Sequence, residues 1–382
     1  MAAYQTTDFD VDIKIGEFQF PLGHGEFPGI IVNSSVRFAL PEATIMLQDP
    51  YNSVGQEFEV THGQKIQVDV VDKRTDKKKT YKLRVFDVKG STEGNTRTYV
   101  WNCYWDAPKF LMDVYMGSIG ESSKKTSYEA LAILSKRAGL KFEGRHSTND
   151  SQFWYPSNRR ACNFARYIVA NAYRDEKSLM QFGVNLEGRL KYVDYNSIQF
   201  PGKYKFILGG GSTEDEYEIT AYRPLSNSGF ANAYSGYKHK MIHQSIFSYP
   251  PEEYKKIKTR KIADVIMRGE EVSGMLENGR IDYTPIDAGN VHENFFKAKY
   301  KNFRAAMLQS YALEVLVRQP TDVELLDPCS CLITGATKGV NDDIGLEYDM
   351  LNGNYIVTNK TISFEKNNYT EKFHLLRDGI AK

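Results

Sequence analysis

The sequence predicts a mainly β protein of the α+β class, in which an α/β segment is set between two β-rich regions. Short apolar and aromatic runs separated by Gly, Pro, Asn and Asp fill residues 1–110 and return after residue 200. Residues 126–195 instead carry helical spacing followed by a hairpin pattern. The chain has 382 residues, enough for two or three cores, and its 41% hydrophobic and 25% charged residues are typical of globular proteins.

The first 110 residues are expected to form a small β-barrel or sandwich. Their β-branched and aromatic runs recur at the short intervals typical of such folds. The basic stretch 72–82 is expected to be the solvated tip of a hairpin. The expected strands are 29–39, 44–47, 58–60, 65–71, 81–88 and 98–105.

Residues 111–200 are expected to form an α/β insert. Its first helix begins at Thr126, whose spacing to Glu129 is that of a capping box, and ends at Gly139. A second helix of about four turns is capped by Ser157 or Asn158. A hairpin follows, with its turn at residues 186–189. The apolar stripe of the second helix consists of Ala161, Phe164, Ala165, Ile168 and Ala172.

A second β domain is expected from residues 201–230 and 311–382. Strands around a Gly-rich acidic turn open it, and two strands around the polar residues 365–368 close it. Residues 231–310 interrupt this domain as an irregular insertion, rich in Pro, Gly and charges, that ends in a helix. The apolar face of that helix consists of Phe296, Tyr300, Phe303 and Met307.

Charge and targeting signals argue against several partner classes. With 49 Lys and Arg against 48 Asp and Glu, the net charge of +1 creates no overall field for nucleic acid or a membrane surface. The first ten residues contain acids and no apolar targeting core, and no uncharged run is long enough to span a membrane. The protein is therefore expected to stay in the cytosol unless other factors carry it out.

No residue pattern predicts a catalytic, cofactor-binding or metal-binding site. The chain lacks the HExxH, GxSxG, Walker A, EF-hand and GxGxxG motifs. Its four cysteines are too unevenly spaced for a disulfide framework. The closest two, Cys329 and Cys331, lack a second Cys or His pair with which to bind zinc.

Several other groups could support a site, but a structural interpretation is favoured for each. His239 and His243 have metal-ligand spacing on a helix, yet their surroundings suit a strand equally well. Trp154 and Tyr155 could stack on a sugar or a base, although such a pair more often anchors a helix start. The remaining groups are the basic run 255–261, the glycines of "GHGEFPG" and the acidic turns, namely Gly23, Gly25, Gly29, Glu214, Asp215, Glu216, Glu218, Asp342 and Asp343.

Five motifs occur in an unusual order along the chain. They are "VTHGQKIQVDV", "SYEALAILSKRAGL", "NDSQFWYPSNRRACNFARYIVANAY", "FGVNLEGRLKYVDY" and "YALEVLVRQPTDVELLDPCSCLITG". This order resembles the baseplate hub proteins of contractile-tailed bacteriophages and, more distantly, late-control D proteins and the hub portion of type VI secretion spike proteins. The resemblance covers approximately residues 20–378. Asp150 and Trp154 match the family's D-x-x-x-W element, whereas Cys329 stands where the family commonly has Gly.

The resemblance implies a non-enzymatic homotrimer in the baseplate of a virion tail, assembled in the host cytoplasm, without a cofactor or membrane span. Each subunit would hold two similar small β-barrels, so that three copies adapt a sixfold tail tube to a threefold central spike. The implied partners are the spike protein, tail-tube or tube-initiator proteins, baseplate wedge proteins and a tape measure protein. DNA would pass through the lumen without specific binding during genome ejection, and the acidic turn 214–218 is expected to face it.

Two other functions remain open at the level of sequence. A wall-degrading or carbohydrate-active baseplate enzyme would need a buried carboxylate pair in a cleft. A receptor-binding or glycan-binding tail protein would expose aromatic side chains in a groove, whereas most Tyr and Phe residues here fall at core spacings.

Overall fold

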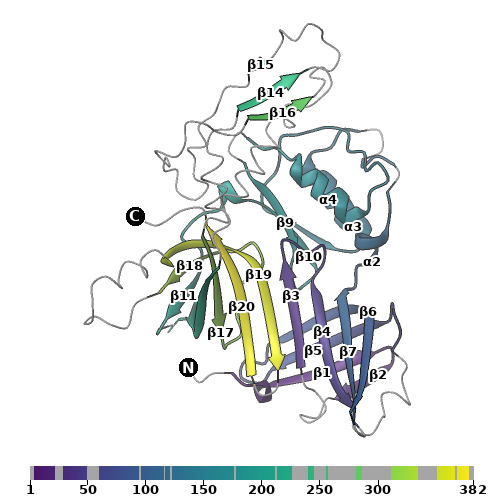
Figure 1. The fold of residues 1–382 in the computed structure, drawn as a ribbon, viewed down its shortest axis with the longest axis vertical. Coiled ribbons are helices and arrows are strands. Elements are labelled where there is room, and N and C mark those ends of the chain that lie inside the picture. Colours follow the sequence, from purple (N-terminus) through teal and green to yellow (C-terminus); the bar gives the residue numbers. More distant parts are fainter. Residues whose placement is uncertain are drawn as a thin grey trace, which may run out of the picture.

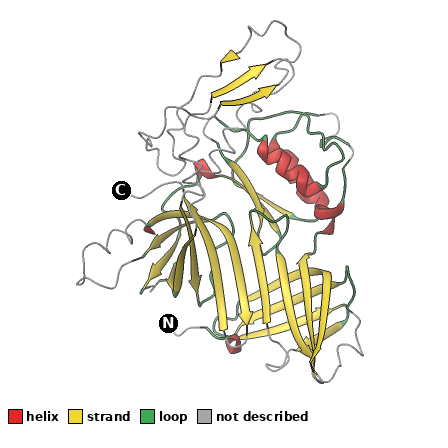
Figure 2. Ribbon diagram, in the orientation of Figure 1, coloured by secondary structure: helices red, strands yellow, loops and turns green. Residues whose placement is uncertain are grey.

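The computed structural model confirms a mainly β fold of the α+β class, with two small barrels and an α/β insert that lies between them in the sequence (Figure 1). Figure 2 shows that the longer helices are confined to this insert. The structure describes residues 4–21, 29–49, 60–93, 96–115, 117–120, 123–175, 178–210, 213–225, 240–244, 255–256, 281–285, 311–333, 351–365 and 368–377.

The N-terminal strands form an antiparallel sheet that curls into the first barrel, in the order β3-β4-β7-β6-β5-β1-β2. Alternate residues of β5 point inward, so Ile66, Val68 and Val70 are buried. The 3₁₀ turn η1 (Thr6–Asp8) precedes this sheet. The strands are β1 (Phe9–Ile15), β2 (Phe18–Pro21), β3 (Gly29–Ser35), β4 (Glu42–Asp49), β5 (Lys65–Asp72), β6 (Lys78–Glu93) and β7 (Thr96–Trp105).

Five of the expected N-terminal strands are confirmed as β3 to β7, while β1 and β2 were not expected. The strand expected over 29–39 ends early, at Ser35, where a turn begins. Both strands of the basic hairpin extend into residues 72–82, so its tip is shorter than expected. Of the expected strand 58–60, only Val60 is described, and it lies outside a strand.

The insert packs its two long helices against a three-stranded sheet ordered β8-β10-β9 (Figure 1). Thr126 and Glu129 form the expected capping box, and Gly139 ends the first long helix at φ 79°. The expected hairpin is confirmed, and β8 adds to it in parallel. The elements are α2 (Pro108–Met112), α3 (Ser127–Ala138), β8 (Lys141–Gly144), α4 (Ala161–Ala170), β9 (Met180–Val184), β10 (Arg189–Asp194) and η2 (Tyr195–Ser197).

The expected start of α4 is wrong. Ser157 and Asn158 have φ values of 48° and 60°, so they form a left-handed turn before the helix. Arg160 occupies the N-cap position without a side-chain hydrogen bond. The helix spans 10 residues, which is nearer three turns than four. Its apolar stripe is buried as expected, and Ala172 is buried just beyond the helix end.

The second barrel is closed by the continuous segment β12–β13, which pairs with a different neighbouring strand at each end. Strand β12 pairs with β11, and β13, which follows after Thr220, pairs with β17. The Thr220 N–H donates to the Leu316 carbonyl at 3.0 Å, which continues this seam. The strands around the acidic turn are present, but β11 and β12 pair in parallel. The strands are β11 (Tyr204–Leu208), β12 (Glu216–Ile219), β13 (Ala221–Leu225), β17 (Tyr311–Val317), β18 (Pro328–Leu332), β19 (Gly353–Glu365) and β20 (Asn368–Arg377).

Within residues 231–310 the structure describes one small sheet, ordered β15-β14-β16 (Figure 1). Its strands are β14 (Lys240–Gln244), β15 (Lys255–Lys256) and β16 (Ile281–Pro285). The helix expected over 296–307 lies outside the described residues.

Strand β19 belongs to both barrels. It pairs with β18 through residues 353–356, shifts register between Val357 and Asn359, and then pairs with β3 of the first barrel. Before the shift, Val357 is buried in the core of the second barrel, and after it Ile362 and Phe364 join the core of the first. One continuous sheet therefore carries both barrels.

Candidate functional site at the junction of the barrels and the insert

Residues 319–327, in the loop between β17 and β18, receive contacts from both barrels and from the insert, and we call this segment the junction loop. Its sequence is "QPTDVELLD". Leu326 lies in the left-handed region with φ 68°, and the Asp327 N–H donates to the Glu324 carbonyl at 3.1 Å. This tight turn exposes main-chain carbonyls and carboxylates to three different parts of the molecule.

A fully buried ion pair holds the first half of the junction loop. Lys360 of β19 and Glu371 of β20 lie 3.3 Å apart, and neither side chain reaches solvent. The Lys360 ammonium also donates to the Val323 carbonyl at 2.7 Å and to the Thr321 carbonyl at 3.3 Å. Glu371 accepts hydrogen bonds from the hydroxyls of Thr321 and Tyr369. The pair is thus saturated with partners, as a buried charge must be.

The environment of Glu371 keeps it ionised. Burial alone would raise its pKa, but the positive charges of Lys360 and Lys79 and the hydrogen bonds from the two hydroxyls lower the pKa below its usual value. In Lys360, burial would lower the pKa, and the carboxylates of Glu371 and Glu324 raise it above the usual value. Both partners are therefore charged in the folded protein.

The first barrel reaches the same loop through Lys79 of β6. Its ammonium donates to the Thr321 carbonyl at 3.3 Å, so Lys79 and Lys360 share one acceptor. Burial and the positive charge of Lys360 lower the pKa of Lys79. On the surface, Lys77 forms an ion pair with Asp322 at 3.2 Å. The start of β6 and the residue before it thereby tie the two barrels together.

The insert contacts the second half of the junction loop. Asp327 accepts from Lys191 of β10 at 3.1 Å and from Arg145, which follows β8, at 2.8 Å. Lys191 is buried, so this contact is shielded from water. Asp327 also accepts the Glu324 N–H at 2.9 Å, which keeps the carboxylate in place within the turn. A single carboxylate therefore connects the insert to the second barrel.

An apolar contact supports these ion pairs. Leu325 and Leu326 are buried in a small cluster that joins the insert to the second barrel. Leu325 packs against Gly183 of β9, where an added Cβ would lie only 2.6 Å from the leucine side chain. The other members of this cluster are Leu179, Val193, Tyr195 and Ile356.

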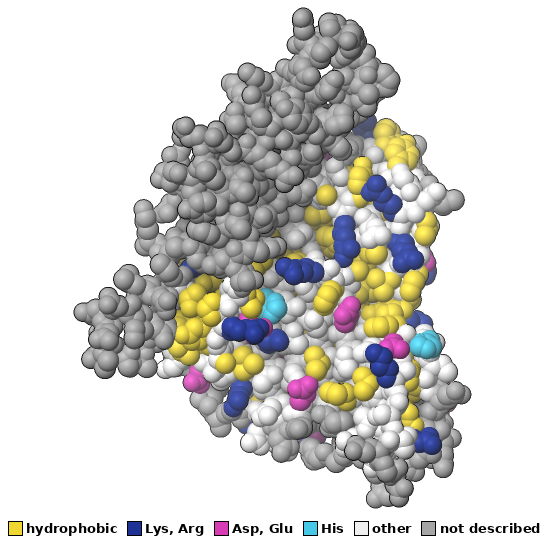
Figure 3. Space-filling model, viewed as in Figure 1, with side chains coloured by type: hydrophobic (Ala, Val, Ile, Leu, Met, Phe, Trp, Pro, Cys, Tyr) yellow, Lys and Arg dark blue, Asp and Glu magenta, His cyan; other side chains and the backbone are white. Residues whose placement is uncertain are grey.

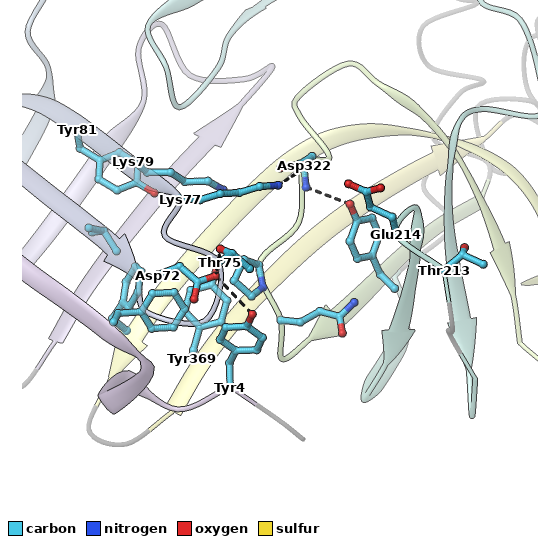
Figure 4. Close-up of a pocket in the computed structure, with 16 residues that line it drawn as sticks. Tyr4, Asp72, Thr75, Lys77, Lys79, Tyr81, Thr213, Glu214, Asp322 and Tyr369 are labelled. Atoms are coloured by element: carbon cyan, nitrogen blue, oxygen red, sulfur yellow. Dashed lines mark hydrogen bonds and ion pairs between the residues drawn. The ribbon is translucent and has the colours of Figure 1, made fainter. Parts of the chain in front are cut away.

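A pocket of about 290 Å³ opens beside the junction loop, between the two barrels (Figure 4). Figure 4 shows Lys77 and Lys79 extending toward Asp322, while Tyr4 donates to Asp72 at 3.4 Å below them. Its apolar wall is an aromatic cluster in which Phe9 lies 4.6 Å from Tyr369 and 5.1 Å from Phe364, centre to centre.

Four charged groups of this pocket have partners within the molecule, namely Asp72, Lys77, Lys79 and Asp322. Asp72 accepts from the Thr75 hydroxyl at 2.7 Å, and the Asp322 N–H donates to the Tyr217 hydroxyl at 3.1 Å. The wall contains both carboxylates and ammonium groups, from Asp72, Glu214, Asp322, Lys77 and Lys79, so the pocket has no single sign of charge. The arrangement joins β1, β6 and the junction loop and resembles an interdomain contact more than a substrate site.

The structure gives Asp150 and Trp154 structural roles. Asp150 is buried and accepts the N–H groups of Ser127 at 2.8 Å and Tyr173 at 2.8 Å, so it fixes the first turn of α3. The Trp154 indole donates to the Lys125 carbonyl at 2.8 Å, just before the same helix. The favoured anchoring interpretation holds for Trp154, but Tyr155 is 59% exposed.

The other candidate residues are not brought together. Cys329 and Cys331 are buried in the core of the second barrel, where burial raises the pKa of both thiols. In the acidic turn, Asp215 pairs with Lys203 at 3.0 Å and Glu216 with Lys205 at 3.4 Å. The direction in which this turn faces in an assembly stays a prediction. Among the described residues, no His, Cys, Asp and Glu side chains form a group that could hold a metal ion.

Several candidates lie outside the described residues. Gly29 begins β3, and of the basic run 255–261 the structure describes two residues, as β15. His243 lies in β14, without a described side chain. The remaining candidates are outside the description, namely Gly23, Gly25, His239, Asp342 and Asp343. No helix in the described part of the chain is long and apolar enough to cross a membrane.

The buried pair was missed at the level of sequence, although a signal was present. After the bulge in β19, the inward positions alternate as Lys360, Ile362 and Phe364. In β20 the same alternation places Glu371 between Tyr369 and Phe373. Opposite charges in the inward phase of two neighbouring strands predict a buried ion pair.

Comparison with known proteins places this architecture among tail proteins. The chain is similar to a tail protein from Neisseria meningitidis MC58, with a TM-score of 0.62 at 10% identity over 97% of both chains. It is equally similar to the 43 kDa tail protein of prophage MuSo2 from Shewanella oneidensis, with a TM-score of 0.61 at 12% identity over 97% of this chain and 98% of the other. The chain has the fold of these tail proteins.

The tail-protein fold also occurs within longer chains. In the half-lidded Francisella PdpA–VgrG complex, a chain matches with a TM-score of 0.51 at 11% identity over 97% of this chain and 57% of its own length. No family model and no curated protein sequence matches this chain. The fold that the resemblance implied is thereby confirmed as that of phage tail proteins. At such low identity, a likeness of structure establishes the fold alone.

Proposed function

We propose that this chain is a structural hub protein at the centre of the baseplate of a phage tail or phage-like injection device. Three copies would form a ring of six barrels, which adapts a sixfold tail tube to a threefold spike and surrounds the channel for DNA. The observation that carries the proposal is the pair of barrels on one shared strand, in a fold that matches two tail proteins over nearly their whole length.

The geometry of the junction supports this role. A ring of alternating barrels keeps its spacing only if the two barrels of each subunit cannot turn against each other. Strand β19 runs through both, and the junction loop is bound from the first barrel by Lys79 and from the insert by Lys191. The insert would act as a bracket that fixes the angle between the barrels.

We also propose a division of the chain, which these contacts support. Residues 1–110 form the first barrel, residues 111–200 the insert, and residues 201–230 with 311–382 the second barrel, while residues 231–310 are an insertion. The outer surfaces would contact the spike, the tail tube or its initiator, wedge proteins and a tape measure protein, in a virion tail. The PdpA–VgrG complex supports a spike-type partner, because part of it shares the fold.

Electron microscopy of the purified protein tests the proposal directly. Class averages with a threefold axis and six barrel-sized densities around a central channel are expected. Particles that remain monomeric at high concentration, or that form rings with another symmetry, would contradict the hub.

The proposed role is non-enzymatic. Asp72 and Asp322 beside the pocket are engaged with a hydroxyl and with a lysine, which supports a structural use of these charges. A gel containing peptidoglycan distinguishes the alternative, because a wall-degrading enzyme would clear it and a structural hub would not.

A further inference from the structure

An extended segment on the outer side of the insert turns two aromatic side chains into solvent. Trp154 points inward and is 1% exposed, so its neighbours on both sides must point outward. These neighbours are Phe153 and Tyr155, which are 42% and 59% exposed. Their rings lie 6.3 Å apart, centre to centre. Outward positions of an extended segment are normally polar, and two adjacent aromatic side chains there need an explanation.

Two other segments carry further exposed apolar side chains next to this one in the insert. Val114 forms a bridge with Arg160, and the Tyr115 N–H donates to the Arg159 carbonyl, so the chain after α2 lies against the chain before α4. Tyr167 of α4 packs edge-on against Trp154 at 6.4 Å. These contacts show that the three segments are neighbours in the insert. We group their exposed side chains as the outer patch, which consists of Met112, Val114, Phe153, Tyr155, Tyr167, Arg159 and Arg160.

The patch gathers most of the exposed large hydrophobic side chains in the described part of the chain. Met112 is 58% exposed and Val114 is 49% exposed, in addition to the three aromatic residues. The two exposed large hydrophobic residues outside it, Phe86 and Leu332, lie in separate strands of the barrels. Clustering of this kind marks a surface that another molecule covers.

The charges around the outer patch have one predominant sign. The exposed cations in its segments are Lys109, Arg159, Arg160 and Arg166, and the described exposed acid there is Asp113. None of these cations forms an ion pair with the described part of the chain. Figure 3 shows hydrophobic and basic side chains side by side over the insert. A complementary partner must therefore supply negative charge together with apolar side chains.

The Arg159 guanidinium is held over the Tyr167 ring at 4.3 Å, which presents its remaining donors outward. Arginine, tyrosine, phenylalanine and methionine are the residue types that protein interfaces favour over the rest of the surface. A nucleic acid fits less well, because Arg159 already covers one face of Tyr167 and aliphatic side chains such as Met112 and Val114 provide no base stacking.

We propose that the outer patch binds an acidic, apolar segment of another protein. Carboxylates of the segment would pair with Arg159 and Arg160, while its apolar side chains would cover Tyr155 and Phe153. This inference goes beyond the proposed function, since it requires neither a ring nor a channel. The two proposals can fail independently. Electron microscopy tests whether the protein forms a ring, and peptide binding tests whether the outer patch binds a partner.

Fluorescence anisotropy with a labelled peptide of sequence ELDYELDF tests the inference on the full-length protein. The wild-type protein is expected to bind the peptide, and the Arg159→Glu/Arg160→Glu variant to bind it at least tenfold more weakly. Phe153→Ser/Tyr155→Ser should weaken binding by about tenfold, in line with the loss of two anchoring rings. The basic peptide KLKYKLKF should not bind.

Matched variants separate the patch from general effects. Lys141→Glu changes an exposed charge elsewhere on the insert, and Leu332→Ser removes an exposed apolar side chain from a barrel. Both should bind the acidic peptide as the wild type does. All variants should keep the wild-type melting temperature, because the altered side chains are exposed.

Three results would overturn the inference. The first is equal peptide binding, or no binding, by wild type and patch variants. The second is binding of single-stranded oligothymidylate that the patch variants lose while the acidic peptide does not compete. The third is a smaller oligomer in light scattering for the patch variants, which would assign this face to contacts between copies.

Discussion

At the scale of single residues, the main effect of Lys360 and Glu371 is to fix one conformation of the junction loop. Their contribution to the free energy of unfolding, compared with apolar residues in the same place, is small. A buried pair gains little over well-packed apolar residues of the same size, but it tolerates no misplacement of its partners. Here the partners include the carbonyls of Thr321 and Val323, so the pair selects one position of the junction loop.

Replacing Lys360 by Met is expected to lower the free energy of unfolding by about 3–5 kcal/mol, because Glu371 would remain buried without a counter-charge. Met fills a similar volume, so the loss reports charge and hydrogen bonding more than packing. Urea denaturation followed by circular dichroism measures the difference.

The matched control is Lys372→Met on the neighbouring position of β20. Lys372 is 41% exposed and lies 3.8 Å from Glu314, so its replacement should cost at most about 1 kcal/mol. The double variant Lys360→Met/Glu371→Gln should recover part of the loss. Similar losses for Lys360→Met and Lys372→Met would show that the buried pair has no special role.

The pH dependence of stability is expected to depend on Asp69 of β5. Burial would raise its pKa, but hydrogen bonds from Lys14, Thr80, Gln67 and Lys78 lower it well below the usual value. Because the folded-state pKa lies below the unfolded one, the contribution is present above the unfolded pKa of about 3.9 and is lost as the pH falls.

Unfolding curves between about pH 5 and pH 2 should therefore be less pH-dependent in Asp69→Asn than in the wild type. Asp76→Asn serves as the control, since this side chain is exposed at a turn and Asn tolerates its positive φ of 55°. Parallel pH profiles for wild type and Asp69→Asn would refute the assignment.

Single residues show where sequence interpretation reached its limit. The capping box at Thr126 was predictable because its partners are three residues apart. Lys79 and Lys191 could not be placed, since their acceptors lie in a loop more than a hundred residues away. Alternation within a strand identifies a charged side chain that points into the core. The residue that supplies its counter-charge or hydrogen-bond acceptor depends on the tertiary fold.

At the scale of elements, the β9/β10 hairpin is fastened to the first barrel by its turn. Gly188 has φ 70°, and an added Cβ would lie 2.2 Å from the Trp105 ring of β7. The glycine thus satisfies two constraints, a left-handed backbone and close approach to an indole. The hairpin in turn places Lys191 opposite Asp327.

Gly188→Ala is expected to destabilise the protein by about 2–4 kcal/mol, of which about 1 kcal/mol reflects the positive φ and the rest overpacking against Trp105. Hydrogen exchange in β9 and β10 should become faster. Gly139→Ala isolates the backbone contribution, because Gly139 has φ 79° and open space at its Cβ position. If both variants lose the same stability, the contact with Trp105 is unimportant.

Elements with strong local signals were predicted, and those defined by distant pairing were not. The apolar stripe of α4 was recognised, but its start was misplaced because Ser157 and Asn158 also favour left-handed turns. The strands β11 and β12 were recognised, but their parallel pairing was not. Strand β11 also pairs in parallel with β18, which lies more than a hundred residues away in the sequence. Strand β1 was overlooked although "FDVDIKI" alternates apolar and polar residues, which is the pattern of a half-buried strand.

At the scale of the whole molecule, the order of motifs predicted the fold better than any single pattern did. The sequence contains no repeat, and the relation between the barrels is visible only in the pairing of β19 with β3 on one side and β18 on the other. Sequence analysis assigned no function to the junction loop, although its Pro and three acids between two strands distinguish it from a simple turn. Its importance follows from three separate contacts that converge in space.

The junction loop makes a prediction about assembly that depends on the proposed hub. Asp327→Ala removes the acceptor of Arg145 and leaves Lys191 buried without a partner, so the insert should loosen from the second barrel. Native mass spectrometry and electron microscopy should show fewer closed rings, while circular dichroism should retain the β signal of the barrels. Glu143→Gln is the control, because Glu143 contacts Arg145 at 3.6 Å from a solvent-accessible position. If Asp327→Ala forms rings as completely as Glu143→Gln does, the angle between the barrels is set by β19 alone, and the bracket role of the insert is wrong.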